Sequence, residues 1–170
     1  MLDRIKQWWR AAKDYLHISV MKYEQIPRHD DQPYLDRWII FRCRWFSILL
    51  HKFIGSDDEC LHDHPWPFMA FIFGGPGYWE WVPAQGSESM YKLQPGQRTD
   101  VAPNGEYLTG TWYPRWSVLF RSADWVHRVE TPTIPVWTLV VHLRKCRSWG
   151  FETKQGWKHH SEYSYKQHCE

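Results

Sequence analysis

The chain has 170 residues, with 21 Lys and Arg against 19 Asp and Glu, and 18% of its residues are aromatic, including 13 Trp. This length fits one domain, residues 1–170, that can bury a substantial hydrophobic core. A net charge of +2, with both signs spread along the chain, is below what a dedicated nucleic-acid-binding protein carries. We therefore expect no nucleic-acid polymer as a partner.

Membrane and secretory segments are not indicated. The longest apolar run, residues 68–75, is too short to cross a bilayer, so we expect no membrane partner. Residues 1–16 carry charges throughout and lack the apolar stretch of a secretory signal. The four cysteines have no paired short spacing, which argues against a disulfide scaffold or a zinc ribbon. These observations predict a cytoplasmic protein.

The chain begins with a predicted amphipathic helix. Apolar residues recur at three- and four-residue steps with charged residues between them: Ile5, Trp8, Trp9, Ala12 and Leu16. This period places the apolar side chains on one face of a helix. We therefore expect an N-terminal α-helix within residues 1–20.

Residues 36–145 have the pattern of a β-barrel. Short runs rich in Ile, Val, Phe, Trp and Thr alternate with turn residues. The predicted strands are 38–44, 46–53, 60–64, 68–73, 78–82, 89–93, 98–101, 117–121, 125–129 and 136–144. Many short strands without a second helical block indicate a mainly β fold, an antiparallel sandwich or barrel. Residues 146–170 lose the alternation but keep aromatic residues, which predicts an irregular C-terminal tail packed over the barrel.

Three histidines are candidate metal ligands. His62 and His64 are two residues apart on a predicted strand, so their imidazoles project from the same face. A third ligand must come from elsewhere, and His127 on the predicted strand 125–129 is the best candidate. Imidazole suits first-row transition metals, whereas Ca and Mg prefer oxygen ligands. The alternative is that these are ordinary polar residues at a barrel mouth, or core histidines bonded to backbone carbonyls.

Two blocks resemble the signatures of the cupin superfamily. Residues 60–80, CLHDHPWPFMAFIFGGPGYWE, look like the first signature, in which an HxH pair starts a strand and a glycine turn follows the next strand. Residues 121–130, RSADWVHRVE, look like the second, shorter signature. The resemblance covers about residues 55–145. It implies a cupin-like jelly-roll barrel with one metal held by His62, His64 and His127.

One departure from the cupin pattern concerns the ligand set. Many cupins place a carboxylate four or five residues after the second histidine, where this chain has Phe68 and Met69. The resulting three-His set, with the HRVE run, is similar to thiol dioxygenases of the cysteine dioxygenase type. That resemblance implies Fe(II) as the preferred metal, with Zn or Mn as alternatives. At residues 62–64 the chain has HxH in place of the HxD pair of 2-oxoglutarate-dependent oxygenases.

Several residues are candidates for binding or catalysis beside the metal. Three neutral ligands leave the charge of a divalent ion uncompensated, which favours a small anionic substrate. Arg42 and Arg44 share a strand face, where they would hold a carboxylate or phosphate if they point inward and would be solvated if they point outward. Glu80 is either a general acid or base facing the cavity, or the partner of a nearby arginine.

Two residues next to the HxH histidines have different predicted roles. Cys60 has the same strand parity as the HxH pair, so it is a fourth ligand, a thiol beside the metal, or a small buried apolar residue. Asp63 points to the opposite face and is predicted to form a salt bridge or to orient a ligand rather than to bind the metal.

The leading functional hypothesis is a metal-dependent enzyme acting on a small anionic molecule, as a non-haem iron dioxygenase. A second hypothesis is a cupin that binds or sequesters a small nucleotide-like ligand without catalysis. A third is a redox-neutral zinc or manganese hydrolase or isomerase. Because jelly-roll barrels often dimerise through edge strands, a homodimer is also compatible with the sequence, although no pairing strand is identified.

Overall fold

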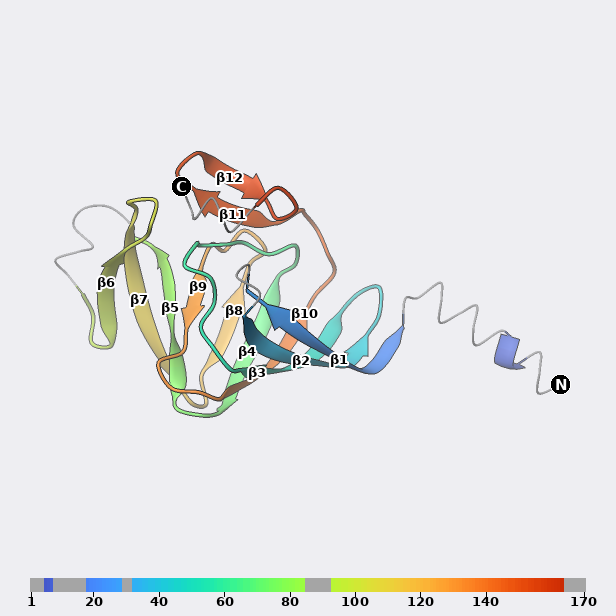
Figure 1. The fold of residues 1–170 in the computed structure, drawn as a ribbon. Coiled ribbons are helices and arrows are strands. Elements are labelled where there is room, and N and C mark those ends of the chain that lie inside the picture. Colours follow the sequence, from blue (N-terminus) through green and yellow to red (C-terminus); the bar gives the residue numbers. More distant parts are fainter. Residues whose placement is uncertain (1–4, 8–17, 29–31, 85–92, 164–170) are drawn as a thin grey trace.

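The computed structural model describes residues 5–7, 18–28, 32–84 and 93–163, and within them the chain is almost entirely β (Figure 1). The strands are β1 (Ser19–Pro27), β2 (Pro33–Arg42), β3 (Ser47–Phe53), β4 (Phe68–Gly74), β5 (Gly77–Pro83), β6 (Gln97–Val101), β7 (Tyr107–Pro114), β8 (Val118–Arg121), β9 (Arg128–Glu130), β10 (Val136–His142), β11 (Gly150–Thr153) and β12 (Gly156–His159).

Two antiparallel sheets enclose the core. The larger sheet has the order β1-β2-β3-β10-β4-β8, and the smaller has the order β6-β7-β5-β9. Their inner faces contribute jointly to one apolar cluster, with Leu49, Ile72 and Val136 from the large sheet and Tyr78 and Val129 from the small one. Every strand pair in the described residues is antiparallel, and crossovers place β10 between β3 and β4 and β5 between β7 and β9. This arrangement confirms the predicted mainly β, jelly-roll-like fold.

Strict alternation of burial in β3 and β10 shows which side chains face the interior. In both strands every second residue, beginning with the first, is buried. Only four of these eight inward positions are apolar, the kind of residue that the buried face of a strand usually carries. Four are polar instead: Ser47, His51, Thr138 and His142. The barrel interior is therefore not uniformly apolar.

Strand β7 was not predicted, and its pairing with β5 explains why its sequence is atypical. Gly110 lies in the strand interior directly opposite Trp81. A Cβ at Gly110 would lie 2.7 Å from the indole of Trp81, so the ring packs directly on the glycine backbone. A glycine that weakens the strand pattern is thus required by a close approach in the folded protein.

Other differences from prediction lie at the ends of the chain. Residues 5–7 are helical, residues 8–17 lie outside the described part, and β1 already begins at Ser19, so the helix does not reach residue 20. The sheets therefore start well before residue 36. The predicted irregular tail contains the β11–β12 hairpin, which lies over one end of the barrel (Figure 1).

Two predicted strands are shorter than expected, and one is outside the described chain. The 60–64 segment forms only isolated bridges at His62, and the 125–129 segment is replaced by β9. Most of the predicted strand 89–93 is not described. No helix in the described residues has the length and apolar character needed to span a membrane.

Candidate metal centre

The two segments that carry the three histidines are hydrogen-bonded to each other. His62 and His127 form an antiparallel bridge, in which each backbone N–H donates to the other residue's carbonyl at 2.9 Å. His62 is also bridged to Phe151 of the C-terminal hairpin. The first and last predicted ligands, separated by more than sixty residues in sequence, are therefore held in fixed register by backbone contacts.

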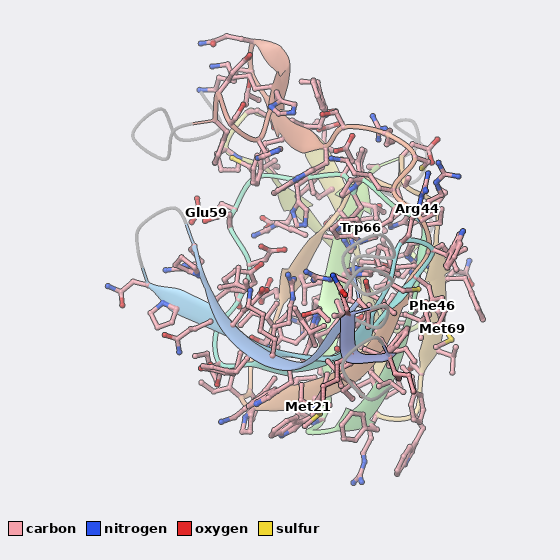
Figure 2. The ribbon with its side chains drawn as sticks, turned by 90° about the vertical axis from the view of Figure 1, so that its right-hand side faces the viewer. Met21, Arg44, Phe46, Glu59, Trp66 and Met69 are labelled. Atoms are coloured by element: carbon pink, nitrogen blue, oxygen red, sulfur yellow. The ribbon has the colours of Figure 1, made fainter. Side chains whose placement is uncertain are left out.

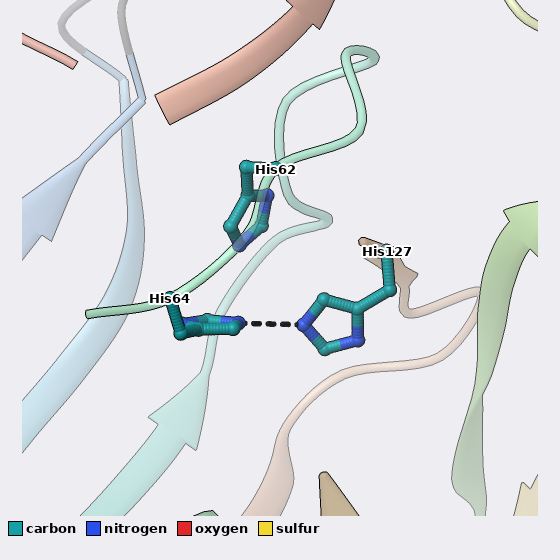
Figure 3. Close-up of side chains that lie close together, drawn as sticks. All are labelled: His62, His64 and His127. Atoms are coloured by element: carbon teal, nitrogen blue, oxygen red, sulfur yellow. Dashed lines mark hydrogen bonds between the residues drawn. The ribbon is translucent and has the colours of Figure 1, made fainter. Parts of the chain in front are cut away.

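The three imidazoles converge as predicted. One nitrogen from each of His62, His64 and His127 lies within 4.8 Å of the other two, and Nε2 of His64 is 2.8 Å from Nε2 of His127 (Figure 3). Two imidazole nitrogens bound to one ion each lie about 2.1 Å from it, which this spacing permits. His62 and His127 are buried and His64 is half-buried. The donor set therefore fits a divalent transition metal.

A buried carboxylate orients His127. Glu80, 3% exposed, lies 2.7 Å from His127 Nδ1. It also accepts hydrogen bonds from Arg121 Nε at 2.9 Å, from Arg121 Nη2, and from Trp125 Nε1 at 3.2 Å. Burial alone would raise the pKa of Glu80, but the hydrogen bonds from Arg121 and His127 lower it to about 2. An ionised carboxylate only accepts, so His127 carries its proton on Nδ1 and offers the Nε2 lone pair to a metal.

The other two ligands are also in their metal-binding form. Burial, followed by the nearby histidines, lowers the pKa of His64 well below its usual value. Burial likewise lowers the pKa of His62, although Asp57 opposes the shift. Nδ1 of His62 is 3.6 Å from Asp57 Oδ2 and has no hydrogen-bond partner among the described residues. Neutral imidazole is the form that binds metals.

Asp63 anchors the HxH segment from its other side, as predicted for a residue of opposite orientation. Its carboxylate accepts hydrogen bonds from the Gly150 backbone at 2.8 Å and from Trp157 Nε1 at 3.1 Å. It also pairs with Arg147 Nη1 at 2.6 Å. The C-terminal hairpin is thus fastened to the residue that lies between His62 and His64.

Cys60 is not part of the three-His cluster. Its Sγ lies 2.8 Å from the hydroxyl of Tyr163, and it packs in a small apolar cluster with Phe151 under the C-terminal hairpin. Cys60 is disulfide-bonded, so it is neither a metal ligand nor a free thiol beside the metal.

The histidines open onto a cavity of about 110 Å³ inside the barrel. The opposite wall comes from the large sheet, where Arg37, His51 and Thr138 are paired in one row across β2, β3 and β10. Arg37 Nε donates to His51 Nε2 at 3.1 Å. The hydroxyl of Thr138, a residue only 1% exposed, has no hydrogen-bond partner among the described residues.

Sequence reasoning missed this wall. Arg37 has the same parity as the buried Leu35 and Ile39, but the predicted strand began one residue after it. His51 and Thr138 occupy inward positions of strands that were predicted correctly. The available signal was a polar residue at a position where the alternating pattern of the strand calls for an apolar one.

The other predicted site residues lie outside this cavity. Glu80 is behind His127 rather than on the cavity surface. Arg42 and Arg44 line a neighbouring pocket, together with His142, which contributes to both. Their predicted role in binding an anion stays a prediction, but it concerns that second pocket.

No protein-family model and no curated protein matches the sequence. Solved structures do match it. The Fe(II) form of HppE with an alternative substrate has a TM-score of 0.50 at 11% identity, covering 72% of this chain and 56% of that one. The chain has the cupin fold. An RmlC-like cupin from Shewanella frigidimarina matches with a TM-score of 0.43 at 12% identity, covering 75% of this chain and 86% of that one.

A further match is the DMSP lyase DddQ from Ruegeria pomeroyi, with a TM-score of 0.47 at 12% identity, covering 75% of this chain and 58% of that one. This cupin-fold chain spans little more than half the length of the HppE and DddQ chains that it matches. At these identities the similarity establishes the fold, and the chemistry must be argued from the residues.

Proposed function

We propose that this protein is a non-haem iron dioxygenase acting on a small anionic substrate. The observation that carries the proposal is the convergence of His62, His64 and His127 at the wall of an interior cavity. A ferrous ion held there would supply open positions for a substrate donor atom and O2 and would exchange electrons with them. The Fe(II) in HppE, which has a similar fold, is consistent with this choice of metal.

Charge balance favours an anionic substrate. The carboxylate of Glu80 is paired with Arg121, so it does not offset the charge of an ion bound to three neutral imidazoles. Across the cavity, the side chain of Arg37 makes one hydrogen bond among the described residues, through Nε to His51. Its terminal guanidinium nitrogens remain as donors for a carboxylate.

The cavity limits the substrate in size. A volume of about 110 Å³ is well below that of ordinary drug-sized ligand pockets. Phe68, Tyr78 and Val140 form the apolar part of its lining, beside polar residues such as Arg37, His51 and Asp57. A small carboxylate fits this space better than a nucleotide, which makes catalysis a better proposal than nucleotide sequestration.

The test is O2 consumption by protein reconstituted anaerobically with Fe(II) and mixed with small thiol carboxylates, such as cysteine and thioglycolate. We expect uptake that requires both iron and substrate and that is lost in His62→Ala. Absence of iron binding, or uptake that is equal in His62→Ala, would refute the proposal. Retention of Zn or Mn with no O2 uptake would favour redox-neutral chemistry instead.

A further inference from the structure

A second polar row crosses the inner face of the large sheet at the end of the barrel. Arg42 is paired with Ser47, and Ser47 is paired in turn with His142. Residues directly opposite each other in antiparallel strands project to the same face. Ser47 and His142 are both at inward, buried positions, so Arg42 is directed to the same side.

A β-bulge explains the direction of Arg42. The register between β2 and β3 shifts between Ile39 and Phe41, which inserts Ile40 as an extra residue. Ile39 is fully buried and Ile40 is 37% exposed, so the alternation restarts one residue later. Bulges commonly re-aim a side chain at the rim of a barrel. Arg42 is five residues after the inward-facing Arg37, so without this bulge it would face outward.

Two turns bring further cations to the same place. The chain after β2 contributes Arg44, and the chain after β10 contributes Arg144 and Lys145, all lining one pocket of about 250 Å³ with Arg42. Trp66, labelled with Arg44 in Figure 2, forms part of its wall. The indole of Trp66 stacks on the ring of His142, with centroids 4.4 Å apart.

Among the described residues, these four positive charges have no close negative partner. No carboxylate in the described chain lies within ion-pair distance of Arg42, Arg44, Arg144 or Lys145. Glu24, which interacts electrostatically with Arg42, is itself paired with Lys22 at 2.8 Å. Like charges gathered in one concave pocket repel each other, and a multiply charged anion would offset that repulsion.

We propose that this pocket binds the phosphate group of a small phosphorylated molecule. Arginine donates two parallel hydrogen bonds to phosphate oxygens, and the Ser47 hydroxyl and Lys145 ammonium add further donors. Four cations match a phosphate or pyrophosphate better than they match a single carboxylate. A compact pocket in a chain of net charge +2 does not form the extended basic stripe that a nucleic-acid backbone requires.

The phosphate site is separate from the metal centre. None of the three histidine ligands lines the pocket, so binding does not require the ion. Trp66 and His142 line both the pocket and the three-His cavity, so the two sites share a wall. The phosphate site can therefore be tested on metal-free protein, and its failure is distinguishable from failure of the iron proposal.

The experiment is isothermal titration of metal-free protein with inorganic pyrophosphate and phosphate at constant ionic strength. We expect saturable binding with one site per chain. Replacing two exposed arginines of the pocket, in the double variant Arg44→Gln and Arg144→Gln, should weaken pyrophosphate binding about tenfold or more. The matched control is Arg98→Gln with Arg115→Gln. These arginines stack on Trp79 and Trp116 and do not line the pocket, so binding should be unchanged.

Three outcomes would overturn the proposal. The first is no saturable binding of either anion at millimolar concentration. The second is equal weakening in the two double variants, which would be a general effect of net charge. The third is tighter binding of a short oligonucleotide than of pyrophosphate at the same salt concentration, which would assign the surface to a polymer. Thermal unfolding of both variants controls for folding.

Discussion

Glu80 and Thr138, buried polar residues on the small-sheet and large-sheet sides of the interior cavity, differ in how completely their polar atoms are hydrogen-bonded. On the side of the small sheet, Glu80 accepts hydrogen bonds from three different side chains. On the side of the large sheet, the buried hydroxyl of Thr138 has no hydrogen-bond partner among the described residues, and neither has the indole nitrogen of Trp66. Buried polar groups are nearly always paired in native proteins, so each exception needs an explanation.

The difference indicates a division of roles. The satisfied side holds His127 in one orientation and tautomer before any ligand arrives, which is how outer partners support metal ligands. The unsatisfied side presents donors whose desolvation is compensated only when a ligand occupies the cavity. We therefore expect changes on the small-sheet side to affect the metal and changes on the large-sheet side to affect the substrate.

The largest effect is expected from the ligands themselves. His127→Ala should reduce metal affinity by more than about a hundredfold, beyond the range typical of outer partners, because two imidazoles alone do not complete the donor set. Elemental analysis of purified protein measures the occupancy. His160→Ala is the control, since His160 stacks on Trp149 and is not one of the three ligands. Full metal occupancy in His127→Ala would contradict a shared site.

Glu80→Gln tests the small-sheet side of the cavity. The amide leaves Arg121 without its carboxylate partner and keeps only one acceptor oxygen for the donors around Glu80, which weakens the hold on the His127 tautomer, so metal affinity should fall about 10- to 100-fold. A competitive chelator titration gives the affinity. The matched control is Glu130→Gln, because Glu130 accepts from Trp81 Nε1 at 2.8 Å and does not contact His127. Equal losses in both variants would mean that Glu80 acts through general stability.

Local patterns predicted the ligands, whereas the residues around them depend on strand pairing. The HxH spacing and the isolated His127 need only a short sequence window, and the cupin resemblance linked them. The pairing of Glu80 with His127 could not be predicted, because it requires knowing that β5 lies beside β9. The antiparallel strand pattern likewise predicted most of the barrel but not β7, whose glycine reflects a contact with Trp81.

The two arginines show that one inserted residue invalidates a prediction of the buried face from alternating positions. Arg37 and Arg42 both face inward although they differ in parity, because the bulge after Ile39 shifts the alternation. A bulge leaves no reliable sequence signature, so the face of Arg42 remained ambiguous from periodicity. Periodicity therefore predicts a strand's buried face only up to its first irregularity.

Arg37→Gln tests the large-sheet side of the cavity. Binding of a small carboxylate such as thioglycolate to the metal-loaded protein should weaken about tenfold, because one charge-assisted bidentate contact is lost. Metal content should stay unchanged, since Arg37 contacts His51 and not the three ligands. The measurement is a binding titration against the control Arg98→Gln. A loss of metal with unchanged carboxylate affinity would reverse the proposed roles of the two walls.

The smallest effect is a pH dependence of stability to which buried histidines of the large sheet contribute, together with His62 and His64. Burial, with Arg37 and Arg42, lowers the pKa of His142 to about 3, and burial lowers the pKa of His51 well below 6.5. Below pH 6.5 these histidines take up protons in the unfolded chain, whereas their imidazoles stay neutral in the folded protein. The free energy of unfolding should therefore fall as the pH drops from 6.5 toward 3, by at most about 1.4 kcal/mol per pH unit for each group.

Denaturant unfolding of metal-free protein between pH 6.5 and pH 5 measures this slope above the range in which Glu80 titrates. The lowered pKa of Glu80 adds a further loss only as the pH falls below about 4.5. His142→Gln should flatten the slope by nearly one group's share, because Gln does not titrate, whereas His160→Gln should change it little. An unchanged slope in His142→Gln would mean that His142 is protonated in the folded protein, and the inner face of the large sheet would then carry one more positive charge than the proposed balance allows.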